Sequence, residues 1–173
     1  MFFKALPATK TVDARAWVRA LGLKEHPEGG YFKETYRAEM EIDAPGFGGR
    51  RSAGTAIYYL LKSGQFSAFH RIKSDEVWHF YAGSPLAVHV IDREGGKYHK
   101  MIIGRSSKRP ALQAVVKAGC WFAASVDRAR SYSLAGCTVA PGFDFRDWEV
   151  GRRGELLALY PEHRQVIEKF TRQ

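Results

Sequence analysis

The segment from Gly64 to Gly83, GQFSAFHRIKSDEVWHFYAG, predicts two neighbouring strands joined by a short polar turn. Alternate side chains of a strand share a face. In each strand one face combines large apolar residues with a single ionisable group: Phe66, Ala68, His70 and Ile72 in the first, Glu76, Trp78 and Phe80 in the second. A charge among apolar side chains is costly unless it has a partner. We therefore expect His70 and Glu76 to face each other or a polar ligand.

Short alternating segments follow one another closely through most of the chain, separated by Gly, Pro and polar turns. Besides the pair above, we expect strands at residues 31–38, 56–61, 86–91, 98–103, 113–116, 121–124 and 132–139. Close antiparallel strands without intervening helices are typical of a two-sheet barrel. A jelly roll of this kind can enclose one small ligand. The sequence thus predicts an all-β fold, and 173 residues indicate a single domain spanning 1–173.

Helices are expected only at the two ends of the chain. The first covers residues 12–21, with Thr11 as N-cap and Gly22 as the stop. After Phe145 the pattern becomes helical, with a short helix or strand at 155–159 and a second helix opened by Pro161. The Gly-rich and Arg-containing segment 42–54 is expected to be a mobile surface loop and a candidate lid over a pocket.

The spacing of Gly64, His70, Glu76 and Gly83 resembles the first signature motif of the cupin superfamily. The resemblance is strongest to the cupin-5 family, a branch without an agreed activity, and it rests on four stretches: EGGYF at 28–32, TAIYYLL at 55–61, DEVWHFYAG at 75–83 and VAPGFDF at 139–145. The resemblance implies a cupin double-stranded β-helix, or jelly roll, with short N- and C-terminal helices. It also implies a homodimer, for which the exposed edges of a jelly roll offer pairing surfaces.

The chain departs from the better-known cupins at two metal-ligand positions. Ile72 stands where the second histidine of the first motif belongs, and Phe122 stands where the second motif provides another histidine. Only His70 and Glu76 remain of four ligands, whereas stable sites offer three or four protein donors. We expect no metal cofactor. The alternative is a divalent metal held by His70, Glu76 and His79, which requires a bulge that turns His79 inward.

His70 and Glu76 remain as a proton-handling pair, because a carboxylate beside histidine fixes its tautomer and favours its charged form. Resemblance to the dTDP-sugar epimerases, barrels of the same superfamily, implies a metal-independent isomerase or epimerase of a polar, sugar-like substrate. In it His70 is the base, Glu76 its orienting partner and Tyr31 a possible acid. Candidate binding residues are Trp78 and Trp121 as aromatic walls, Arg37 as an anchor for a carboxylate or phosphate, and Asp144.

Two other functions stay open: a non-catalytic small-ligand-binding cupin, and a metal-dependent cupin oxygenase or isomerase. A purely structural role for His70 and Glu76 in a filled barrel is the further alternative. The candidates share a small-molecule ligand, and a structure with the pocket's contents visible would separate them most directly.

The net charge and the composition limit the kinds of partner that the protein can have. The net charge of +9 raises the question of nucleic acid, but the basic residues are scattered in loops without a recognisable binding motif. We therefore expect a solvated basic surface.

The longest apolar runs are too short to span a membrane and no secretory signal is evident, so we expect a cytoplasmic protein. Cys120 and Cys137 lie in apolar strand-like runs and are expected to be buried free thiols.

Overall fold

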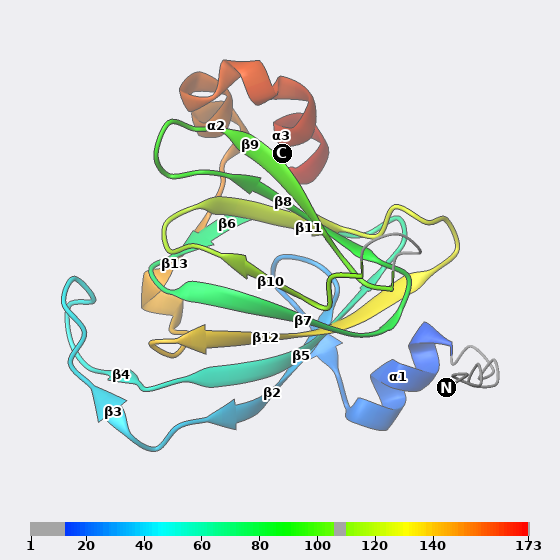
Figure 1. Ribbon diagram of the computed structural model, residues 1–173, viewed down its shortest axis with the longest axis horizontal. Coiled ribbons are helices and arrows are strands. Elements are labelled where there is room, and N and C mark those ends of the chain that lie inside the picture. Colours follow the sequence, from blue (N-terminus) through cyan, green and yellow to red (C-terminus); the bar gives the residue numbers. More distant parts are fainter. Residues whose placement is uncertain (1–12, 106–109, 173) are drawn as a thin grey trace, which may run out of the picture.

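Two antiparallel sheets face each other and enclose the core (Figure 1). The computed structural model describes residues 13–105 and 110–172. One sheet has the strand order β1 (Lys24–Glu25), β2 (Tyr31–Arg37), β5 (Thr55–Lys62), β12 (Tyr132–Ala140), β7 (Asp75–Gly83) and β10 (Gln113–Val116). The other has the order β13 (Trp148–Val150), β6 (Phe66–Ile72), β11 (Trp121–Ser125), β8 (Leu86–Ile91) and β9 (Tyr98–Ile103). The predicted all-β jelly roll is confirmed.

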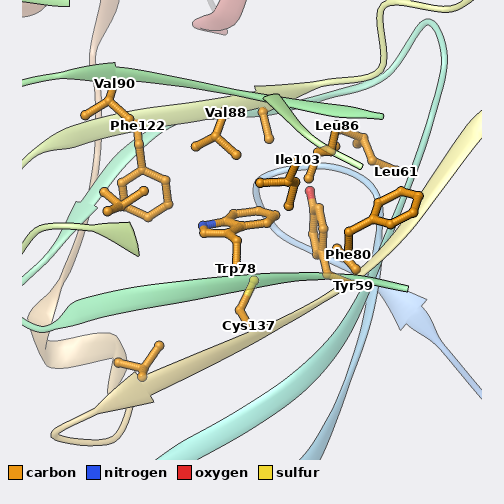
Figure 2. Packing of buried hydrophobic residues seen from close by; sticks show 14 of the residues in the cluster. Tyr59, Leu61, Trp78, Phe80, Leu86, Val88, Val90, Ile103, Phe122 and Cys137 are labelled. Carbon is orange, nitrogen blue, oxygen red and sulfur yellow. The ribbon is translucent and has the colours of Figure 1, made fainter. Parts of the chain in front are cut away.

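Large apolar side chains from both sheets fill most of the space between them (Figure 2). Trp78 and Phe80 of β7 project from one sheet, and Val88 of β8 and Phe122 of β11 project from the other. Full burial of such a side chain contributes about 1.5–3 kcal/mol. The alternation predicted for the strand that contains Trp78 and Phe80 therefore determines which of its faces becomes core.

Short helices cover the outer faces of the sheets (Figure 1). Helix α1 (Ala14–Leu21) packs on the six-stranded sheet, where Trp17 Nε1 donates a hydrogen bond to the Tyr132 hydroxyl over 3.0 Å. Helices α2 (Arg153–Leu159), η2 (Pro161–His163) and α3 (Arg164–Phe170) follow the last strand. Of their residues, Leu156, Ile167 and Phe170 form a second apolar cluster with the outer face of the five-stranded sheet.

Two local expectations differ from the structure. Strand β13 lies where only helical structure was expected, and it pairs with β6 through Val150 and His70. The segment 42–54 contains part of a hairpin, β3 (Glu41–Ile42) with β4 (Arg51–Ser52). Arg51 anchors this hairpin because its guanidinium donates two bonds, of 2.6 and 3.0 Å, to the buried Asp147 carboxylate of the short helix η1 (Phe145–Asp147).

The first helix begins at Ala14, and its expected N-cap Thr11 lies outside the described residues. Its expected stop is confirmed, because Gly22 ends it in the left-handed conformation at φ 63°. Cys120 and Cys137 are buried free thiols, as expected. No helix within the described ranges is long and apolar enough to cross a membrane.

Candidate functional site

A cavity of about 310 Å³ lies between the sheets and opens beside the segment 143–145. Strands β2, β5, β7 and β12 form one side, and β6 contributes His70. The turn between β1 and β2 supplies two further ionisable groups. The residues that line the cavity are His26, Glu28, Phe32, Glu34, Arg37, Thr55, Ile57, Tyr59, His70, Glu76, Trp78, Cys137, Val139, Phe143, Asp144 and Phe145. The cavity therefore brings together His70 and Glu76, the two residues that the motif spacing singled out.

His70 is buried, and its ring nitrogens have different neighbours. Nδ1 lies 2.8 Å from the carbonyl oxygen of Ala68, and a carbonyl only accepts, so we assign the proton to Nδ1. Nε2 lies 3.3 Å from Oε2 of Glu28, and the Phe122 ring packs 4.0 Å from the imidazole. Burial lowers the pKa of His70 to about 4. At neutral pH the ring is uncharged, and a proton gained at Nε2 would be held by the Glu28 carboxylate.

Glu28 is the carboxylate partner of His70, a role that we assigned from the sequence to Glu76. Its Oε1 accepts a hydrogen bond from Trp148 Nε1 and its Oε2 accepts one from Ser67 Oγ over 3.0 Å. Burial raises the pKa of Glu28, and the nearby His26 and these two donors partly oppose the rise. Two strands that are distant in the sequence, β6 and β13, thus converge on the carboxyl group of the β1–β2 turn.

The turn that carries Glu28 depends on glycine. Gly29 has φ 115° and Gly30 has φ 77°, conformations that side chains disfavour. A Cβ on Gly29 would lie 2.2 Å from the carbonyl oxygen of Phe66, so only glycine lets this turn approach β6. His26 lies in the same turn, and its Nδ1 accepts the backbone N–H of Glu28 over 3.2 Å. The sequence signal was the run EGGYF at 28–32, which we used for the family resemblance and not for the site.

Glu76 is the first residue of β7 that faces the cavity, and its side chain is buried. Burial raises its pKa to about 8, and a hydrogen bond from the Cys137 thiol opposes the rise. Among the described residues no ion pair or hydrogen bond joins Glu76 to His70, so the expected direct pairing is absent there. Glu76 is instead a carboxylic acid that keeps its proton at neutral pH.

Aromatic side chains form much of the cavity wall. Trp78 meets Tyr59 edge to face with ring centroids 5.6 Å apart, and the Tyr59 hydroxyl donates to the Gly29 carbonyl over 2.7 Å. His26 packs edge-on to Phe32 at 4.5 Å. The indole N–H of Trp78 is buried without a hydrogen-bond partner among the described residues. The predicted aromatic wall at Trp78 is therefore present, with Tyr59 as its neighbour.

At the mouth of the cavity, charged side chains neutralise one another. A β-bulge between Glu34 and Tyr36 shifts the alternation of β2, so that Arg37 falls on the same face as Glu34. Arg37 donates two hydrogen bonds to the Glu34 carboxylate, of 3.0 and 2.7 Å, and two of 3.2 Å to the Phe143 carbonyl. Asp144 accepts two bonds from the Arg146 side chain, of 3.0 and 2.7 Å.

The remaining candidates lie away from the cavity. Tyr31, the expected acid, packs with the α1 cluster on the outer side of β2, and its hydroxyl accepts from Lys62 Nζ over 3.1 Å. Trp121 belongs to the cluster under α2 and α3. Because side chains alternate along a strand, these residues project away from the cavity, and the sequence did not indicate which sheet face would be covered by helices.

His79 also projects outward, where its ring nitrogens lie 3.0 Å from the Thr138 hydroxyl and 3.0 Å from the Gln113 amide. The register of β7 runs without a bulge from Glu76 to His79, so the alternative ligand set of His70, Glu76 and His79 does not assemble. Across residues 13–105 and 110–172, no group of three or more His, Cys, Asp or Glu side chains is arranged to hold a metal ion.

A two-sheet barrel with an enclosed, partly aromatic cavity and buried ionisable groups defines a protein of the cupin class. The chain belongs to the cupin superfamily family DUF985, which matches residues 15–151. This confirms the resemblance inferred from its motifs.

Several known proteins are similar to this chain. A hypothetical protein from Leishmania major has 37% sequence identity, with a TM-score of 0.87 over 95% of this chain and 100% of that one. Protein SO0799 from Shewanella oneidensis has 36% identity, with a TM-score of 0.85 over 94% and 99%. The uncharacterized protein YML079W of Saccharomyces cerevisiae is 29% identical in an alignment of length 147 that covers 72% of this chain and 68% of that protein.

Proposed function

We propose that this cupin is a metal-independent isomerase or epimerase of a small polar carbonyl compound, of which a sugar-like molecule is one form. The observation that carries the proposal is that one cavity buries both His70 and Glu76, in surroundings that favour opposite protonation of the two groups. Burial lowers the pKa of His70 to about 4 and raises that of Glu76 to about 8, so near pH 7 one is a free base and the other a protonated acid. Environments that separate pKa values in this way suit acid–base work.

The positions of the two groups support proton transfer across a bound ligand. His70 comes from β6 and Glu76 from β7, strands of the two facing sheets, so a ligand between the sheets meets them from opposite sides. In the proposed step, Nε2 of His70 takes a proton from the carbon next to the carbonyl, and the electron pair forms an enolate. Glu76 then gives its proton to the carbonyl oxygen or to the opposite face of that carbon.

Glu28 has a positioning role in this mechanism. Its carboxylate lies 3.3 Å from Nε2, so it stabilises the imidazolium that forms when His70 takes up the proton. Ser67 and Trp148 hold the carboxylate in place. The acid that resemblance suggested, Tyr31, is replaced in this proposal by Glu76, because Tyr31 lies outside the cavity.

Deuterium exchange tests the proposal even while the substrate is unidentified. A panel of small keto and aldehyde compounds, sugars and sugar nucleotides included, is incubated with the protein in D₂O, and NMR follows exchange at the carbon beside the carbonyl. We expect exchange that is lost in His70→Gln and Glu76→Gln and retained in Glu94→Gln, a variant of an exposed residue far from the cavity. If compounds of the panel bind but none of them exchanges, the proposal is wrong and the protein is a non-catalytic ligand-binding cupin.

A further inference from the structure

We propose that the ligand of the cavity carries a nitrogen group, cationic or rich in N–H donors, which Glu76 binds between aromatic walls. This inference rests on the proposed function, because it names the ligand class of the same site: near pH 7 an N–H group of the ligand donates to the unprotonated oxygen of the Glu76 carboxylic acid, and a cation binds the ionised form that Glu76 takes at higher pH. It excludes a carboxylate or phosphate as the group that reaches the inner end of the cavity.

Acidic side chains outnumber basic ones in the lining of the cavity. Among the described residues of the lining, Arg37 is the one Lys or Arg, whereas four are acidic: Glu28, Glu34, Glu76 and Asp144. The whole chain has a formal charge of +9, so this concentration of acids is local. Because arginines already neutralise Glu34 and Asp144, the preference for hydrogen-bond-donating groups comes from the two inner acids, Glu28 and Glu76.

Three of the four acids already have strong partners within the protein. Glu34 is held by Arg37, Asp144 by Arg146, and Glu28 by two hydrogen-bond donors and the neighbouring histidines. The partner of Glu76 is the Cys137 thiol, a weak donor. Buried carboxyl oxygens normally accept several hydrogen bonds. Glu76 therefore has unused acceptor capacity that a ligand can satisfy.

The walls beside Glu76 suit a flat or cationic nitrogen group. Trp78 stands two residues further along the same strand, and Tyr59 meets it edge to face. Aromatic faces attract cations, most strongly where water is excluded. A carboxylate or phosphate has the opposite preference, and Arg37, which would otherwise receive it, already donates to Glu34 and to the Phe143 carbonyl.

Several other titratable groups act on Glu76 or line the same space. Cys137 of β12 and Glu28 of the β1–β2 turn influence it directly. The remaining ones in the lining are His26, Glu34 and Arg37 before β5, Tyr59 of β5, His70 of β6, and Asp144 after β12. Arg172 beyond α3 acts on Glu28. Because Glu28 disfavours the ionisation of Glu76, a cation bound to the ionised Glu76 offsets this effect.

An isosteric series of probes tests the inference. Benzamidinium, benzamide and benzoate have nearly the same flat shape but carry charges of +1, 0 and −1. Binding to the intact protein is measured by calorimetry or NMR titration. At pH 9, where Glu76 is ionised, we expect benzamidinium to bind at least about tenfold more tightly than benzoate, because a charge-assisted contact with a buried carboxylate is strong. Equal binding of the three probes, preference for benzoate, or no binding would each overturn the inference.

Two further measurements identify Glu76 as the responsible group. Glu76→Gln should abolish the preference for benzamidinium, whereas Glu94→Gln should retain it. In the unmodified protein, the affinity for benzamidinium should rise about tenfold from near pH 7 to near pH 9, because the cation requires the ionised carboxylate. The pH dependence is measured on the unmodified protein, so it does not depend on whether Glu76→Gln folds. An affinity that stays constant with pH would contradict the assignment to Glu76.

The two proposals can fail separately. Benzamidinium binding through Glu76 without deuterium exchange on any carbonyl compound supports the ligand class and contradicts the enzymatic role. Exchange that depends on His70 and Glu76, together with a preference for benzoate, supports the enzyme and overturns the ligand class.

Discussion

Phe122 and Ile72 place apolar side chains beside His70, at the two positions where the cupin resemblance implies histidine ligands. The Phe122 ring packs 4.0 Å from the imidazole, and Ile72 lies two residues beyond His70 on the same face of β6. Both side chains are buried in the main core cluster. Apolar groups at these positions offer no electron pairs to a cation, so neither residue adds a metal ligand beside His70.

Restoring histidines at these positions should create a metal site. We expect Ile72→His with Phe122→His to bind Zn²⁺ with a dissociation constant of roughly micromolar or below, because three imidazoles and a carboxylate form a common zinc ligand set. Titration with zinc, manganese and iron(II) measures this, and the double variant combined with His70→Ala is the control. Micromolar binding by the unmodified protein, lost in His70→Ala alone, would favour a metal-dependent cupin instead.

At the scale of single elements, helix α1 shows how a cap orients a segment. Gly22 ends the helix in the left-handed conformation, and its N–H bonds back to the carbonyls of the last turn. This places Leu23 in the cluster that Leu60 and Tyr132 form beneath the helix. The helix thereby covers the outer face of the six-stranded sheet, on the side away from the cavity.

We expect Gly22→Ala to lower the free energy of unfolding by about 1 kcal/mol. The reason is backbone strain alone, because a Cβ at this position meets nothing closer than 3.7 Å. Gly154→Ala is the matched control: it lies in α2 at a position without positive φ, and its Cβ would enter open space. Urea unfolding should show Gly154→Ala unchanged or slightly stabilised. Equal effects of the two substitutions would show that α1 does not depend on its cap.

At the scale of the whole molecule, buried ionisable groups make stability depend on pH. His70 and His89 have pKa values lowered to about 4 by burial, so the unfolded chain binds more protons and stability rises with pH from about 4 to 6.5. Glu76 has the opposite sign, because its folded pKa is raised to about 8 and the folded protein binds more protons. Its contribution falls as pH rises from about 4.5 to 8.

Stability should therefore be greatest near pH 6.5 and fall above it, with a slope of at most about 1.4 kcal/mol per pH unit from one proton. Urea unfolding at a series of pH values measures the profile. We expect Glu76→Gln to remove most of the decline between about pH 6.5 and 8, and Glu94→Gln to leave it unchanged. A Glu76→Gln profile that declines as steeply as that of the unmodified protein would show that Glu76 is not the group responsible. The homodimer expected from the family resemblance stays a prediction at this scale.

Local sequence determined the strands, their inward faces and the class of fold. Alternation placed His70, Glu76 and Trp78 on interior faces, and the spacing between glycines identified the cupin barrel. Periodicity succeeds here because burial of one strand face is a property of neighbouring residues. The absence of metal ligands at Ile72 and Phe122 was inferred from the resemblance to the cupin motifs, and the metal-free site stays a prediction.

Only the tertiary structure decided which groups meet. Glu28 reaches His70 because a glycine turn brings β1–β2 against β6, a contact between residues 42 positions apart that no local pattern encodes. A bulge in β2 moved Arg37 onto the cavity face, and packed helices left Tyr31 and Trp121 on outer faces. Periodicity assigns a side chain to one of two faces, whereas the partner of a buried charge depends on how the sheets close over it.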